Sequence, residues 1–244
     1  VTKEGACVYY STETGLLWGI QTLRQALEQA NFFTSGSAKY LPMVDIKDAP
    51  KYDWRGFHID VVRHMFTVDY LKKVIDCLSF YKINKLHLHL TDDQGWRIEI
   101  KKYPKLTEVG AWRVDQEDKH WDGRYTPAAD EKGTYGGFYT QEELKELVAY
   151  AATKNIEVIP EIEMPAHVSS AIAAYPELSC HERPIGVPSG GVWPITDIYC
   201  AGKENTFLFL ENVLTEVMDI FPSKYIHLGG DEAPKTRWTT CEKC

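Results

Sequence analysis

The sequence predicts an α/β protein: the N-terminal half, strands 1–4, of a TIM (β/α)8 barrel, preceded by the end of a small α+β domain. Three observations support this fold class. From about residue 57 onward, short apolar segments alternate with amphipathic segments of helical period. Ionisable residues follow each of four predicted strands, at the end where a TIM barrel builds its active site. No glycine-rich phosphate loop follows a strand, which speaks against a nucleotide-binding doubly wound sheet.

The first 50 residues are expected to belong to a different unit. Residues 14–30 are predicted to form a helix, because apolar residues recur on one face at three- or four-residue spacing. These residues are Leu16, Ile20, Leu23, Leu27 and Ala30. Residues 31–52 have the composition of a linker. The predicted domains are residues 1–50, the C-terminal part of a small α/β domain ending in a long helix and linker, and residues 51–244, the first half of the barrel.

Four strands and three helices are predicted in the second domain. The strands are Phe57–Val61, Lys85–Leu90, Ile156–Ile162 and Tyr225–Leu228. The helices are Val68–Tyr81 with Thr67 as N-cap, a helix capped by Thr140 and running to about Lys154, and Asn205 to about Ile220. Right-handed crossovers then give a parallel sheet. A barrel needs eight strands, so the same or another chain must supply the missing half, and the first and fourth strands have open edges.

Composition excludes some partners. The formal net charge of −8 argues against a nucleic-acid backbone as partner, which clustered Lys and Arg would bind. No apolar run reaches membrane-spanning length. The seven Trp and fourteen Tyr are compatible with stacking on sugar rings. No secretory leader is visible and Val1 is not an initiator Met, so we expect a mature product or a fragment.

The six cysteines are too few for a disulfide scaffold at this length. Cys180 and Cys200 flank one loop and would be able to bridge in an oxidising compartment. Cys241 and Cys244 form a C-x-x-C at the end of the sequence, where no further ligand follows to complete a zinc site. Paired or free thiols are therefore favoured over a metal, and no cofactor is expected.

The segment Gly229-Gly230-Asp231-Glu232 is the sharpest candidate for chemistry. In an extended strand the two carboxylates would point to opposite faces. The preceding glycines permit backbone angles that turn both toward one cleft. Two carboxylates in one pocket separate each other's pKa values, which suits acid/base work. The alternative is a helix N-terminus with acidic residues in its first turn, but three other polar strand ends favour a site.

Arg63 follows Asp60 by three residues just past the first strand. At the rim of a barrel its guanidinium offers several fixed donors to vicinal hydroxyls. The alternative is a surface arginine paired with Asp60 or Asp69.

His87 and His89 share a face of the second strand, which allows a hydrolytic zinc with Asp231 or His167 as further ligands. Both lie before the strand's end, so buried imidazoles bonded to backbone or Asp are favoured. Asp92 and Asp93, at the strand's end, are better placed to orient another group. A carboxylate such as Asp92 holding His167 would in turn support Glu232.

In this order, the residues resemble family 20 glycoside hydrolases, the β-N-acetylhexosaminidases. The matching segments are Trp54-Arg55-Gly56 with the Asp60-x-x-Arg63 step, His89-Leu90-Thr91-Asp92-Asp93-Gln94-Gly95-Trp96-Arg97, Pro160-Glu161-Ile162-Glu163-Met164-Pro165-Ala166-His167, and His227-Leu228-Gly229-Gly230-Asp231-Glu232. The resemblance covers roughly residues 52 to 240. The first 50 residues look like the tail of the small domain that precedes the barrel in this family.

The resemblance implies an exo-acting retaining hydrolase that removes terminal β-linked N-acetylglucosamine or N-acetylgalactosamine. Catalysis in this family is substrate-assisted: the 2-acetamido oxygen attacks C1 and forms an oxazolinium. Glu232 would be the acid/base, Asp231 would hold the acetamido N–H, and Arg63 would bind the C3 and C4 hydroxyls. His167, backed by Asp92, would sit behind Glu232. Secretion or periplasmic export suits such substrates.

Two departures from the family pattern remain. Glu163 and Ala166 stand where the family commonly has Asp and Gly, and the extra methylene puts the contact of Glu163 in doubt. The family's aromatic wall around the acetamido group comes from strands five to eight, which this chain lacks. This chain by itself is therefore expected to be inactive. The alternatives are a non-catalytic sugar-binding or truncated module and a zinc-dependent barrel hydrolase using His87 and His89.

Overall fold

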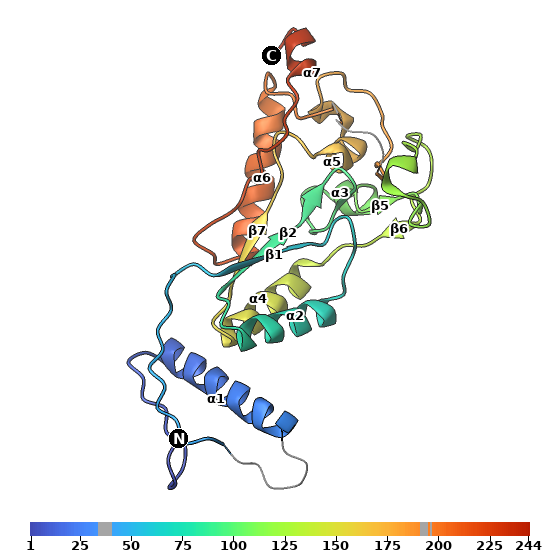
Figure 1. The fold of residues 1–244 in the computed structure, drawn as a ribbon. Coiled ribbons are helices and arrows are strands. Elements are labelled where there is room, and N and C mark those ends of the chain that lie inside the picture. Colours follow the sequence, from blue (N-terminus) through green and yellow to red (C-terminus); the bar gives the residue numbers. More distant parts are fainter. Residues whose placement is uncertain (34–40, 191–194, 196) are drawn as a thin grey trace.

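The central sheet consists of three parallel strands in the order β1-β2-β7 (Figure 1). They are β1 Gly56–Asp60, β2 Lys85–His89 and β7 Glu157–Glu161. The register aligns their carboxyl ends, because Asp60 pairs with His89 and His89 pairs with Glu161. The computed structural model describes residues 1–33, 41–190, 195 and 197–244. This α/β fold with a parallel sheet agrees with the predicted class.

Three helices pack on the sheet and bury its core: α2 Val68–Phe80, α4 Gln141–Thr153 and α6 Glu204–Ile220. Helices α2 and α4 lie side by side, and α6 contacts α4 (Figure 1). Both predicted caps are confirmed: the Thr67 hydroxyl accepts from Tyr70 N–H at 3.2 Å, and Thr140 forms a capping box with Glu143. The buried apolar side chains come from strands and helices alike, among them Leu71, Ile75, Leu86, Leu88, Leu144, Leu147, Val158, Phe209 and Val213.

The first three predicted strands and the three helices are confirmed to within two residues, but the fourth strand is wrong as predicted. Residues 225–228 form only an isolated bridge between Glu161 and His227. Backbone hydrogen bonds from His227 N–H to Pro160 O (2.9 Å) and from Ile162 N–H to His227 O (3.0 Å) hold it beside β7. A segment paired on one side and ended at once by two glycines makes too few bonds for a continuous ladder.

Shorter elements, which the sequence did not predict, fill the connections at the carboxyl side of the sheet. Two hairpins are built from pairs of two-residue strands, and the rest are short helices. They are β3 Thr91–Asp92 with β4 Gly95–Trp96, β5 Trp112–Arg113 with β6 Tyr135–Gly136, α3 Lys105–Glu108, η1 Trp121–Gly123, α5 Ser169–Ala174, η2 Pro176–Leu178 and α7 Thr236–Thr240.

Helix α1, Glu13–Phe33, lies at the end of the molecule opposite α7 (Figure 1). Its contacts with the rest are largely polar: Gln25 donates to Phe80 O at 2.6 Å, and Arg55 lies over the Trp18 ring at 4.6 Å. The predicted helix over residues 14–30 is confirmed by α1; of its five apolar residues, Ile20 is exposed and the other four are half-buried. Of the predicted linker, residues 34–40 lie outside the described residues, and residues 41–52 form no helix or strand. No helix in the described parts has the length and apolarity to cross a bilayer.

Candidate active site at the carboxyl edge of the sheet

The loops that leave the carboxyl ends of the strands bring the predicted residues together. This edge is where parallel α/β folds place their ligands. Arg63 follows β1, Asp92 follows β2, His167 follows β7, and Asp231 and Glu232 follow the segment bridged to β7.

Arg63 is anchored by two carboxylates. Its Nη1 lies 2.7 Å from Asp60 Oδ2 and its Nη2 lies 2.6 Å from Asp92 Oδ2, while Nε donates to Gln94 Oε1 at 2.9 Å. Pairing with Asp60, raised as a structural alternative, thus occurs together with a second pair to Asp92. Burial alone would raise the pKa of Asp60, but Arg63 lowers it below its usual range. The guanidinium is held in one place while its side chain stays 38% exposed, which leaves donors available at the rim.

Asp92 is the buried centre of this group. Besides Arg63, its Oδ2 accepts from His89 Nε2–H at 2.9 Å, and its Oδ1 lies 3.4 Å from His167 Nδ1. Burial acts to raise the pKa of Asp92, but the hydrogen bonds from His167 and His89 and the charge of Arg63 hold it well below its usual range. Asp92 is therefore a carboxylate at any pH at which the protein works.

His167 connects Asp92 to the carboxylate pair, as the sequence predicted for its position. Its Nε2 lies 3.5 Å from Glu232 Oε2 and 3.6 Å from Asp231 Oδ2. Its backbone has a φ of +55°. Burial opposes protonation, but the hydrogen bonds with Asp92 and Asp93 raise the pKa of His167 to about 11. The imidazolium thus places positive charge between two groups of carboxylates.

Asp93 shares His167 with Asp92; the sequence placed both at the strand end to orient another group, but named Asp92 as the carboxylate that holds His167. Its Oδ2 lies 3.3 Å from His167 Nδ1, slightly nearer than Asp92. Its Oδ1 accepts from the Ser169 N–H at 3.0 Å and the Ser169 hydroxyl at 2.6 Å. The only sequence signal was its place beside Asp92 after the second strand. Ser169, the first residue of α5, thus holds Asp93 beside the ring.

The turn Gly229-Gly230 brings Asp231 and Glu232 to the same side. Gly229 and Gly230 have φ values of +61° and +95°, and Glu232 itself has +48°. Both carboxylates therefore point to one side, as predicted, although extended backbone would separate them. Both also reach His167, which was predicted for Glu232 alone. The alternative of a helix N-terminus is wrong, since α7 begins at Thr236, four residues after Glu232. The two side chains are 64% and 57% exposed.

Glu163 lies directly beneath that turn. A Cβ atom on Gly229 would overlap the carboxyl group of Glu163, and its φ of +61° also favours glycine there. The Gly230 N–H donates to Glu163 Oε2 at 3.4 Å, and the Glu163 N–H donates to the Thr91 hydroxyl at 2.9 Å. Burial, followed by the charges of Glu161 and Asp231, raises the pKa of Glu163 to about 8. The side chain is thus a neutral support under the turn at pH 7.

Glu163→Gln is therefore expected to change the pH dependence of stability. The folded-state pKa of about 8 lies above the ordinary 4.5, so the stabilisation by the bound proton is complete below pH 4.5 and is lost as the pH rises through 8. The glutamine carries no such proton. Urea unfolding at about pH 5, 7 and 9 should show a smaller loss of stability for the variant than for the wild type. Glu211→Gln, at an exposed position on α6, is the control; identical pH profiles for Glu163→Gln and the wild type would contradict the expectation.

The histidines of the second strand form a cluster around Glu161. His89 Nδ1 donates to Glu161 Oε2 at 2.7 Å, His87 Nε2 lies 2.8 Å from the same oxygen, and His227 Nδ1 lies 2.8 Å from Oε1. Burial disfavours the charged ring, but Asp92 and Glu161 raise the pKa of His89 to about 9. The favoured interpretation of a buried, hydrogen-bonded imidazole holds for His89, while His87 is only partly buried.

This cluster differs from the zinc site that the sequence left open. Asp231 and His167 were considered as its further ligands. They instead contact each other, with 3.6 Å between His167 Nε2 and Asp231 Oδ2. The residue that joins His87 and His89 is Glu161, whose central position was not predicted. It pairs with His89 across the sheet, 72 residues apart in sequence.

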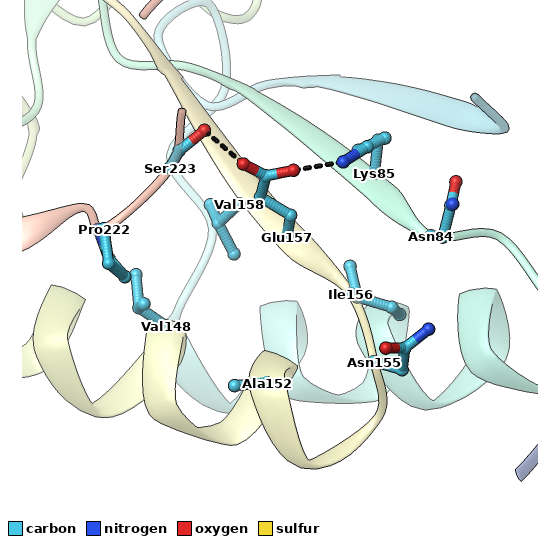
Figure 2. A pocket seen from close by; sticks show the side chains of 10 residues that line it. All are labelled: Asn84, Lys85, Val148, Ala152, Asn155, Ile156, Glu157, Val158, Pro222 and Ser223. Carbon is cyan, nitrogen blue, oxygen red and sulfur yellow. Dashed lines mark hydrogen bonds and ion pairs between the residues drawn. The ribbon is translucent and has the colours of Figure 1, made fainter. Parts of the chain in front are cut away.

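A groove of about 410 Å³ lies at the opposite, amino end of the strands. Figure 2 shows Glu157 between Lys85 and Ser223 there, and the Ser223 hydroxyl donates to Glu157 at 2.8 Å. Lys85 and Glu157 are the first residues of β2 and β7. This face of a β/α unit contributes to stability rather than to chemistry, so the groove is not the candidate active site.

Fold and site together define a class: an α/β enzyme domain with a group of carboxylates, a histidine and an arginine at the carboxyl edge of a parallel sheet. The comparisons identify the family. The model of glycosyl hydrolase family 20, catalytic domain, matches residues 52–244. The chain belongs to glycosyl hydrolase family 20.

Relatives match almost the whole chain. A β-hexosaminidase of Porphyromonas gingivalis is 44% identical over 99% of this chain and 30% of its own length. One of Akkermansia muciniphila is 41% identical over 100% of this chain and 46% of its own. The chain thus spans less than half the length of these curated relatives.

Solved structures agree. The β-N-acetylhexosaminidase of Bacteroides fragilis has a TM-score of 0.76 at 42% identity, covering 94% of this chain and 41% of its own. A mutant Streptomyces plicatus β-hexosaminidase in complex with the product GlcNAc has a TM-score of 0.76 at 39% identity, covering 92% of this chain and 42% of its own.

Proposed function

We propose that this chain is the first half of a (β/α)8 catalytic barrel in an exo-acting, retaining β-N-acetylhexosaminidase. The observation that carries the proposal is the joint approach of Asp231 and Glu232 to His167, at 3.6 and 3.5 Å, on the edge of the sheet where Arg63 is anchored. Two adjacent carboxylates on one rim suit a substrate whose 2-acetamido group and glycosidic oxygen lie on neighbouring carbons.

Each residue then has a separate task in substrate-assisted hydrolysis. Glu232 protonates the leaving oxygen and later takes a proton from the attacking water. Asp231 accepts a hydrogen bond from the acetamido N–H. Its charge stabilises the positive charge that develops as the acetamido oxygen attacks C1. Arg63 donates to the C3 and C4 hydroxyls of the terminal sugar. The imidazolium of His167 orients the carboxylates, and Asp92 and Asp93 hold its ring.

The sheet supports a role as part of a larger barrel. Strand β1 has a partner on one side only, and residues 225–228 bridge to β7 alone among the described strands. Such open edges invite further strands. We propose that strands five to eight, from the same or another chain, close the barrel and enclose the terminal β-N-acetylhexosamine of an oligosaccharide or glycoconjugate.

The test uses two aryl glycosides that differ only at C2. The full-length protein should hydrolyse an aryl N-acetyl-β-glucosaminide at least about a thousandfold faster than the aryl β-glucoside, which lacks the intramolecular nucleophile. Asp231→Asn should reduce the rate with the acetamido substrate at least about a hundredfold. Equal rates on both glycosides would contradict substrate assistance.

A sugar-binding module without turnover is the second candidate, and calorimetry separates it from the first. Binding of N-acetylglucosamine by the full-length protein without hydrolysis of the aryl glycoside would favour it. The presence of all four motif segments with their side chains in contact favours the enzyme.

A further inference from the structure

Four cysteines from three separate segments meet near the end of the chain. Cys180 follows η2, Cys200 follows the bridge between Ser179 and Tyr199, and Cys241 and Cys244 follow α7. Their sulfur atoms all lie within 4.8 Å of one another. The expectation that the C-x-x-C lacks two further ligands is therefore wrong, because the loop of residues 180–200 supplies them.

We propose that Cys180, Cys200, Cys241 and Cys244 form a structural tetrathiolate site for Zn²⁺. Zinc held by four cysteine thiolates is tetrahedral with Zn–S distances of about 2.3 Å, which sets the edges of the tetrahedron at about 3.8 Å. Sulfur separations here are 3.5 Å for Cys200–Cys244 and 3.8 Å for both Cys200–Cys241 and Cys180–Cys244. Cys200 is close to both members of the C-x-x-C, so the geometry selects a common centre rather than separate pairs.

The backbone around the sulfur atoms supports thiolates. Cys241 accepts hydrogen bonds from the N–H groups of Cys244 and Lys243, and Cys200 accepts one from Gly202. Two tight turns thus point N–H groups at sulfur, as the shell around a metal-bound thiolate requires.

The two turns are also packed backbone to backbone. A Cβ atom on Gly202 would overlap the carbonyl group of Lys243. Next to them, Trp238 Nε1–H donates to Tyr199 O at 2.8 Å and Arg237 Nε–H donates to Asp197 at 3.0 Å. The metal would complete this attachment of α7 to the loop that follows α5.

The site has a consequence for the residues before α7. Glu232 is four residues from the start of that helix and Asp231 is five. A zinc clip that holds α7 to the segments around Cys180 and Cys200 restricts the chain that leaves the carboxylate pair. This consequence rests on the proposed function, whereas the metal site itself does not.

The test is metal content, measured on full-length protein purified through a non-metal affinity tag without chelator. We expect about one zinc per chain by mass spectrometry of the metal. After metal exchange, cobalt should give the visible bands of tetrahedral thiolate coordination. Alkylation under denaturing conditions, read by peptide mass mapping, should find Cys180, Cys200, Cys241 and Cys244 as free thiols, like Cys7 and Cys77. Protein without metal in which these four cysteines resist alkylation while Cys7 and Cys77 alkylate would overturn the proposal in favour of two disulfides.

Variants identify the ligands. Cys244→Ser and Cys241→Ser should each retain zinc at least about tenfold more weakly against a chelator and lower the Tm by about 5 °C or more. Cys77→Ser, at an exposed position on α2, is the matched control and should keep the zinc retention and the Tm of the wild type. Equal zinc retention in Cys244→Ser and Cys77→Ser would overturn the assignment. Zinc bound to a protein that hydrolyses no glycoside would leave the site standing and remove the proposed function.

Discussion

Glu232→Gln is expected to reduce kcat of the full-length protein on an aryl N-acetyl-β-glucosaminide by about a thousandfold or more, the scale of general acid–base catalysis. The amide has the same shape as the carboxylic acid but neither donates a proton to the glycosidic oxygen nor takes one from water. His167, at 3.5 Å, is the neighbour that holds the side chain, and an amide oxygen still faces it. KM should therefore change little, and steady-state kinetics measure kcat and KM separately.

The dependence on the leaving group provides the decisive control. A glycoside whose phenol leaves without protonation needs no acid in the first step, so Glu232→Gln should slow its glycosidic cleavage much less than that of a poor leaving group. Glu211→Gln, on the exposed face of α6, should behave as the wild type with both. A uniform decrease across leaving groups would show that Glu232 is not the acid.

Asp92→Asn is expected to have the second largest effect. It removes the negative charge that lies 2.6 Å from Arg63 and 2.9 Å from His89. Removing one partner of a buried ion pair costs about 3–5 kcal/mol of stability. The pKa of His167 should fall from about 11, because Asp92 is the first of the groups that raise it. We expect kcat/KM to fall about a hundredfold as the carboxylate pair loses its oriented imidazolium.

Asp60→Asn is the matched control for that variant. Asp60 also pairs with Arg63, at 2.7 Å, but the contacts with His167 are made by Asp92 and Asp93. Both variants are compared by chemical denaturation, NMR titration of His167 and kinetics. The comparison separates effects that act through Arg63 from effects that act through His167. Asp60→Asn should loosen the anchoring of the Arg63 guanidinium and so raise KM. The pKa of His167 should stay as in the wild type. Equal His167 pKa values in Asp92→Asn and the wild type would refute the link.

Much of the fold was predictable because its signals are local. The period of apolar residues placed α2, α4 and α6, and the hydroxyls of Thr67 and Thr140 marked two of their beginnings. A cap acts within three residues, so sequence alone suffices to find it. The exposed Ile20 shows the limit, since a helical period does not say which neighbour covers the face. The fourth strand failed for a related reason: a ladder depends on how many residues the partner strand engages, and residues 225–228 make only an isolated bridge to β7 before the two glycines.

The candidate residues were legible from sequence in the same way. Gly229 and Gly230 before two carboxylates indicated a turn that brings both to one side, and positive φ values at both glycines bear this out. The spacing of Asp60 and Arg63 left their pairing open as the structural alternative, and the structure shows that pair. The catalytic and binding roles of these residues came from the resemblance to the family, because residue spacing alone does not indicate them.

Only the tertiary structure decided which distant groups meet. Glu161 at the centre of three histidines, Asp93 beside His167, and Glu163 under the glycine turn all involve residues about 70 positions apart. The same holds for Cys180 and Cys244, whose 64-residue separation hid a four-thiol cluster behind two unrelated pairs. Local propensity carries no information on such contacts, because they form only when packing of strands and helices aligns the loops. The sequence by itself determined the long helices, the first three strands and the carboxylate pair; the fold decided what surrounds them.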